Sequence, residues 1–147
     1  MKFKFILILI FYFSLINHIY AQTNKILFKV NNEIITSLDL SEEVKILKII
    51  NSELNNFENE KIYEIAKNSL IRQKVKKIEL LKRLENMKIE EEVLDNLLLD
   101  YFRKFKFRKP NEIKKFLTDN EIDIAQIKER IKIEILWNEY IFAKYSK

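Results

Sequence analysis

ILFKVNNEIITSLDL, residues 26–40, contains the local signals that decide the fold. Residues 26–30 are rich in β-branched and aromatic side chains, and residues 33–36 form a second run of this kind. Asn31 and Asn32 lie between the two runs, and asparagine tolerates the left-handed backbone conformation that a tight turn requires. The pattern predicts a small β-hairpin, or two short strands that need a partner.

A helix is predicted to follow the second strand at once. Thr36 or Ser37 is a suitable N-cap, and Asp39, Glu42 and Glu43 are placed where carboxylates favour the positive end of a helix dipole. Apolar residues then recur at helical spacing and predict one buried face. They are Leu40, Val44, Leu47 and Ile50.

Four more helices are predicted after a polar, asparagine-rich loop at residues 51–59. The first spans about residues 60–86 and the second about residues 89–107, which is apolar on more than one face and is therefore expected to be central or to contact something beyond the core. The expected buried face of the helix at residues 60–86 has four members. They are Ile71, Val75, Ile78 and Leu81.

Pro110 fits the first turn of the next helix, which is expected to end near Asn120. Asp123 is a good N-cap for the last helix, and Gln126 three residues later gives a pair that resembles a capping box. The sequence contains no repeat and no proline- or glycine-rich linker. It predicts one mainly α domain, with a short N-terminal β-hairpin followed by about five helices.

Residues 1–21 have the pattern of a secretory signal peptide. Lys2 and Lys4 precede an apolar stretch at residues 5–16, and Ala21 is a suitable last residue before cleavage. The apolar stretch is shorter than the roughly 20 residues that span a bilayer, so the mature protein, residues 22–147, is expected to be exported without a stable membrane span. An uncleaved N-terminal anchor is the alternative.

Composition excludes most catalytic chemistry. The chain has no cysteine and no glycine, and His18, its only histidine, lies in the expected signal segment. Disulfides, thiolate metal sites, glycine-dependent phosphate loops and the commonest nucleophile–base pairs are therefore excluded from the mature part. The adjacent carboxylates Glu90, Glu91 and Glu92 suit a helix start rather than a metal site. We expect no enzymatic activity, no metal and no cofactor.

The positive charge of the chain is mild and interspersed. Without residues 1–21 it has 27 − 2 = 25 basic and 22 acidic residues, a net charge of +3. Arg72, Lys74, Lys76 and Lys77 are interpreted as a solvated helix face, with nucleic-acid binding as the less favoured reading. No nucleic-acid partner is expected.

The stretch YFRKFKFR, residues 101–108, mixes aromatic and basic residues. One interpretation places Tyr101 and Phe105 in the core with solvated cations around them. The functional interpretation is a partly exposed peptide-binding groove. Its members would be Phe102 and Phe107, with Trp137 beside them and Arg103 and Lys106 at the rim. Single-stranded nucleic acid uses the same residue types and is ranked last for an exported chain.

Three segments, in this order, resemble the N-terminal domain of the SurA family. They are ILFKVNNEIITSLDL, then AKNSLIRQKVKKIELLKRLENMKIEEEVLDNLL at residues 66–98, then NEIDIAQIKERIKIEILWNEYI at residues 120–141. The resemblance implies a helical periplasmic domain that shields unfolded, aromatic-rich outer-membrane proteins or other exported polypeptides. Dimerisation is the other way to cover such an apolar surface.

Relatives in this family also carry parvulin-type prolyl isomerase domains, whose sites use histidines with a cysteine or aspartate. The mature part of this chain has neither histidine nor cysteine, so isomerase activity is not expected. Three hypotheses remain at this point. They are a chaperone-type binding module, a truncated or partner-dependent part of a parvulin-type isomerase, and a structural envelope protein.

Overall fold

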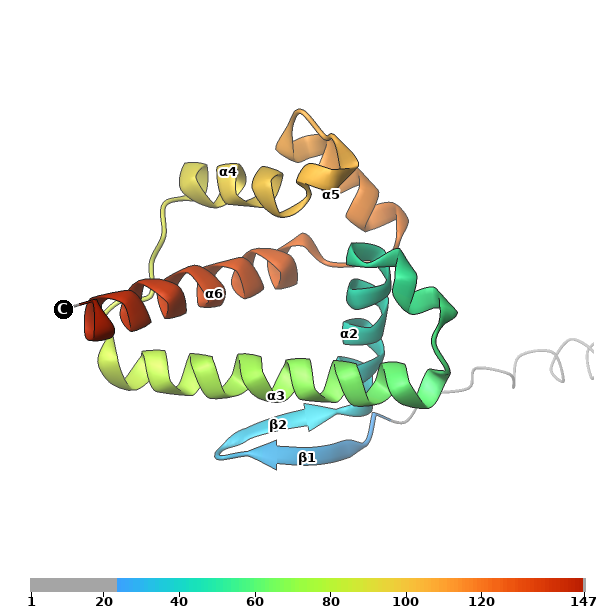
Figure 1. Ribbon diagram of the computed structural model, residues 1–147, viewed down its shortest axis with the longest axis horizontal. Coiled ribbons are helices and arrows are strands. Elements are labelled where there is room, and N and C mark those ends of the chain that lie inside the picture. The colour runs from blue at the N-terminus through green and yellow to red at the C-terminus, as the bar shows by residue number, and fades with distance from the viewer. Residues whose placement is uncertain (1–23, 147) are drawn as a thin grey trace, which may run out of the picture.

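The computed structural model describes residues 24–146 and is mainly helical (Figure 1). Two short antiparallel strands are followed by five α-helices, as the sequence predicts. The expected signal peptide lies outside the described residues. Within the described part, no helix is long and apolar enough to cross a membrane. The strands and α-helices are β1 (Ile26–Val30), β2 (Glu33–Thr36), α2 (Ser37–Ile50), α3 (Asn59–Arg83), α4 (Glu91–Tyr101), α5 (Pro110–Asp119) and α6 (Ile124–Tyr145).

The hairpin and the start of α2 form where the sequence signals lie. Asn31 has a φ of 56°, the left-handed conformation that the tight turn needs. The N-cap of α2 is Thr36, whose hydroxyl accepts a hydrogen bond from the Asp39 amide at 3.2 Å. The Asp39 carboxylate accepts one from the Thr36 amide at 2.7 Å, which completes a capping box. The predicted N-cap is therefore confirmed at Thr36.

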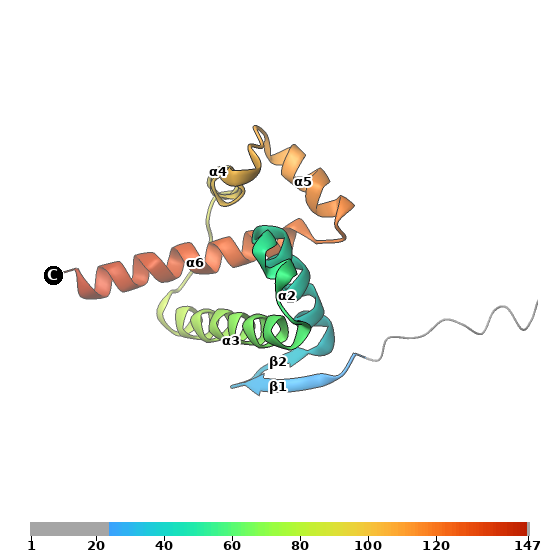
Figure 2. The ribbon, with the colours of Figure 1, turned by 45° about the vertical axis from the view of Figure 1, so that its right-hand side comes forward.

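The two long helices α3 and α6 lie side by side, and α2 stands across their N-terminal ends (Figures 1 and 2). The hairpin lies on the far side of α3 from α6, whereas α4 and α5 cover the opposite side of α6. The main core lies where α2, α4, α5 and α6 meet. Its buried members are Ile46, Leu98, Phe102, Ile113, Leu117, Ile122, Ile127 and Ile131.

The predicted buried faces of α2 and α3 are wrong in part. The deepest positions of α2 are Glu43 and Ile46, while the four predicted apolar positions are only half-buried. On α3, the predicted core residues Val75 and Leu81 are exposed. The buried residues of α3 are Ile62, Ala66 and Leu80.

The reason for the error on α3 is that polar side chains contact the neighbouring helices. Ser69 and Gln73 lie between the buried positions of α3 and bind charged groups of α2 and α6. Lys76 likewise binds Glu134 of α6. An apolar-periodicity rule assigns such residues to solvent and therefore rotates the predicted face.

Two connections also differ from the prediction. Residues 51–59 include a short 3₁₀ helix, η2 (Ser52–Asn56), with Leu54 buried. The predicted helix at residues 89–107 is shorter than expected, because α4 ends at Tyr101 and a 3₁₀ turn, η3 (Arg103–Phe105), follows it. Asp123 caps α6 as predicted, accepting from the Ala125 amide at 2.9 Å. Gln126, however, donates to Glu42 of α2 at 2.8 Å rather than closing a capping box.

Candidate functional site

The aromatic residues that follow α4 form part of the core. Phe102 is only 1% exposed, so the prediction that it is partly exposed is wrong. The rings of Phe105 and Phe107 are stacked at 5.8 Å between centroids, and both contact Phe116 of α5. Phe102 is buried because the chain turns at the end of α4 and brings these rings around it. Phe107 is half-buried, packed against the same core.

The five residues of the predicted groove do not form one surface. Arg103 and Lys106, which were predicted at the rim of the groove, are exposed. Trp137 lies on α6 beside Tyr140, with 5.8 Å between ring centroids, and the Lys76 ammonium lies 6.0 Å from its ring. In the described structure, Trp137 is not among the residues packed around Phe102. The groove expected from the sequence is therefore filled by its own aromatic side chains.

The basic residues of α3 connect elements rather than forming a simple solvated face. Lys74 bonds to Glu33 of β2 at 2.8 Å, and Lys77 pairs with Glu129 of α6 at 3.2 Å. The hydrogen bond and the positive charge of Lys74 lower the pKa of Glu33. Three of the four predicted solvated cations are thus held in contacts between elements, Lys76 being the third. Arg72 is exposed, as predicted.

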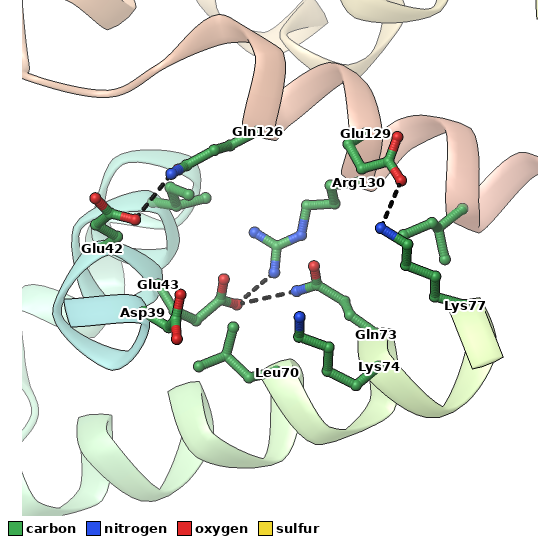
Figure 3. A pocket seen from close by; sticks show the side chains of 12 residues that line it. Asp39, Glu42, Glu43, Leu70, Gln73, Lys74, Lys77, Gln126, Glu129 and Arg130 are labelled. Carbon is green, nitrogen blue, oxygen red and sulfur yellow. Dashed lines mark hydrogen bonds and ion pairs between the residues drawn. The ribbon is translucent and has the colours of Figure 1, made fainter. Parts of the chain in front are cut away.

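A buried polar centre lies between α2, α3 and α6 (Figure 3). Arg130 points from α6 toward α2 and α3, and its Nη2 binds the carboxylate of Glu43. The same Nη2 donates to the Ser69 hydroxyl at 3.0 Å, and the Gln73 amide donates to Glu43 at 3.5 Å. Glu43 is 3% exposed and Arg130 is 8% exposed. One ion pair with two hydrogen bonds therefore joins three helices.

A cavity of about 190 Å³ surrounds this centre, and charged residues of both signs line it. Burial raises the pKa of the nearby Tyr101 hydroxyl, although the positive charge of Arg130 acts in the opposite direction. Burial also acts to raise the pKa of Glu129, but hydrogen bonds from Lys132 and Lys77 lower it. Cations and carboxylates are paired across the helices, and the Ser69 hydroxyl is held by Arg130 within the same set of contacts. The arrangement suits a structural role.

The sequence interpretation missed Glu43 and Arg130. The available signal was position: Arg130 comes three residues after Ile127 and directly before Ile131, so it lies on the buried stripe of α6. A charged residue at such a position is rarely buried unless it is paired. The partner could not be identified locally, because Glu43 lies 87 residues away in the chain.

The outer face of the hairpin exposes apolar side chains. Ile35 is fully buried and pairs with Phe28, so successive side chains point to opposite faces and Ile34 points outward. Ile34 is 41% exposed, and Leu27, at the irregularity in β1, is 42% exposed. Ile26 and Leu38, at the base of the hairpin, are exposed as well. These four residues, Ile26, Leu27, Ile34 and Leu38, are called the hairpin patch.

The hairpin is also a sheet with open edges. In the described residues β1 pairs only with β2, and no third strand joins them. The outer edge of such a strand presents backbone N–H and C=O groups that another extended chain can pair with. The hairpin patch thus combines apolar side chains with free backbone hydrogen-bonding groups.

A second set of exposed apolar residues lies at the end where α3 and α6 finish (Figure 1). Phe142 is 72% exposed, and Tyr145 and Leu81 are exposed beside the same helix ends. These residues belong to the last turns of α3 and α6 and not to a strand. This end therefore offers apolar contact without the strand edge of the hairpin.

No protein-family model, no curated protein and no solved structure matches this chain. The resemblance to SurA N-terminal domains remains a prediction from the sequence. Within the described residues, the hairpin patch combines exposed apolar side chains with an open strand edge.

Proposed function

We propose that the protein is a periplasmic chaperone-type module that binds unfolded exported polypeptides, outer-membrane proteins among them. The binding surface is the hairpin patch with the free edge of β1. The observation that carries the proposal is the coincidence of exposed Leu27 and Ile34 with an unpaired strand edge. The signal-like residues 1–21 and the resemblance to SurA N-terminal domains support the cellular setting.

This surface suits a client that has no fixed structure. An unfolded chain carries free backbone groups along its whole length, so pairing with a strand edge does not depend on its sequence. Apolar side chains of the client gain about 1.5–3 kcal/mol each on full burial, before the cost of association. A few such contacts give weak, reversible binding, which permits later release of the client for folding.

The mechanism proposed here needs no covalent step. β1 aligns the extended client through backbone hydrogen bonds, and the outward side chain of Ile34 and the exposed side chain of Leu27 cover its apolar residues. Lys29 is the cross-strand partner of Ile34 and adds a positive charge on this face. The ion pair between Glu33 of the hairpin and Lys74 of α3 holds the platform against the helices.

The double variant Leu27→Asp/Ile34→Asp is expected to weaken binding of an unfolded outer-membrane polypeptide by at least about tenfold, because it replaces apolar contact by two carboxylates. Fluorescence anisotropy of a labelled client, diluted from urea, measures the effect. Both positions are exposed, so helical circular dichroism should not change.

The matched control is Phe142→Asp/Tyr145→Asp, which makes the same charge change on exposed apolar residues at the other end of the molecule. It should bind the client as the unmodified chain does. Equal weakening by both variants, or unchanged binding by the hairpin variant, would refute the assignment. The milder Ile34→Thr keeps strand propensity and tests the same face if the double variant loses structure.

A further inference from the structure

The turn between α4 and α5 gathers exposed cations. Residues 103–109 contain five of them, and all five are exposed: Arg103, Lys104, Lys106, Arg108 and Lys109. None of these five forms an ion pair within residues 24–146, whereas Lys74, Lys76 and Lys77 of α3 are all paired. Lys114 of α5 is also exposed and outside the ion pairs of the described part. These six residues are called the basic corner.

The aromatic core fixes the shape of the basic corner. Phe105 and Phe107 pack against Phe116, while Lys106 between them has a φ of 59° and is exposed. This left-handed residue turns the chain so that alternate side chains point into the core and into solvent. The backbone of this turn is therefore ordered by the packing of its aromatic side chains, so no backbone ordering is required when the cations meet a ligand.

Few carboxylates offset this charge. Asp100 at the end of α4 is exposed, and Glu112 of α5 accepts a hydrogen bond from the Arg108 backbone amide at 2.8 Å. Asp119 of α5 is already paired with Lys115 at 2.7 Å. Glu91, Asp95 and Glu129 line a pocket with Lys114 but are paired with Lys77, Lys128 and Lys132, so the basic corner keeps a local excess of positive charge.

We propose that the basic corner binds the anionic headgroups of a phospholipid bilayer. Phosphate oxygens accept hydrogen bonds from Lys and Arg, and each cation near an anionic membrane contributes about 1 kcal/mol, or roughly fivefold in affinity. The nearby rings of Phe105 and Phe107 are packed in the core and do not insert. Attachment is therefore peripheral, electrostatic and sensitive to salt.

The positive charge suits nucleic acid as well as lipid, and the export expected from residues 1–21, part of the proposed function, makes a membrane surface the favoured occupant. The basic corner and the hairpin patch lie on opposite sides of the molecule (Figures 1 and 2). A membrane-bound molecule therefore keeps the hairpin patch facing the aqueous compartment. The proposal stands independently of the polypeptide binding assigned to the hairpin.

Co-sedimentation of residues 22–147 with vesicles tests this proposal, since that chain contains every described element but lacks the apolar stretch at residues 5–16. Vesicles of phosphatidylglycerol and phosphatidylcholine should retain it at low salt, and pure phosphatidylcholine should not. Replacing the five cations of residues 103–109 by serine should reduce the partition constant onto the anionic vesicles at least about 100-fold. Raising the salt concentration to 0.5 M should release the unmodified chain.

The control removes five exposed cations elsewhere, so that net charge is equal: Lys25, Lys29, Lys61, Arg72 and Lys88 to serine. It should lose much less retention than the corner variant. Equal losses would show that only net charge matters and would overturn the proposal. No retention on anionic vesicles, or retention of a single-stranded oligonucleotide alone, would overturn it as well.

Discussion

Replacing Glu43 by alanine is expected to destabilise the fold by about 3–5 kcal/mol. The substitution leaves the guanidinium of Arg130 buried between three helices without its counter-charge, and an uncompensated buried charge is strongly unfavourable. Gln73 also loses its hydrogen bond to the carboxylate, whereas the bond from Arg130 to Ser69 does not involve Glu43. Urea unfolding followed by circular dichroism measures the change.

The neighbouring residue provides the control. Glu42 bonds to Gln126 in a more exposed contact, so Glu42→Ala should cost no more than about 1 kcal/mol. The double variant Glu43→Leu/Arg130→Met should recover most of the stability, because it removes both charges and keeps the volume apolar. A Glu43→Ala chain as stable as the Glu42→Ala chain would contradict the structural role of the pair.

Replacing Phe102 by alanine is expected to cost about 3–5 kcal/mol as well. Phe102 contacts the rings of Phe105, Phe107 and Phe116, so its loss opens a cavity where α4, α5 and α6 meet. Phe142→Ala removes an equally large ring from a mostly exposed position and should change the free energy of unfolding by less than about 0.5 kcal/mol.

The same pair of variants separates the two interpretations of the aromatic run. Suppose that Phe102→Ala keeps full stability and loses binding of unfolded polypeptide. Phe102 then belongs to an exposed binding groove, as the sequence interpretation had it, and not to the core. If Phe102→Ala lowers the free energy of unfolding but still binds the client under conditions where it is folded, Phe102 has a core role. Thermal unfolding and anisotropy on the same samples distinguish the outcomes.

Much of the fold could be predicted from local signals. Asn31, Thr36, Pro110 and Asp123 each mark a turn or a helix start through chemistry that acts within a few residues, and the structure has those features at those positions. The helix ends were harder to place. Since the chain contains no glycine, two of its left-handed positions are occupied by Lys106 and Glu121, residue types that give no turn signal. The end of α4 was missed because its C-cap is Phe102, an aromatic residue that continues the apolar pattern of the helix.

The residues that matter most for packing could not be found in this way. Burial of Phe102 depends on Phe116, which arrives from the next helix, and burial of Glu43 depends on Arg130, which arrives from the last one. Periodicity treats charged side chains as solvated, so it cannot recognise a pair whose members meet only in the folded state. The exposure of Leu27 and Ile34 likewise follows from the way the hairpin lies on α3.

Backbone amide hydrogen exchange in the presence of an unfolded outer-membrane polypeptide tests the central claim most directly. If the client pairs with the hairpin, amides of Ile26–Val30 should gain protection on its addition, and Leu27→Asp/Ile34→Asp should abolish that gain. Amides at residues 103–109 should exchange as they do in the free protein. Protection confined to residues 103–109 or to the end of α6, with none in β1, would contradict the assignment of polypeptide binding to the hairpin.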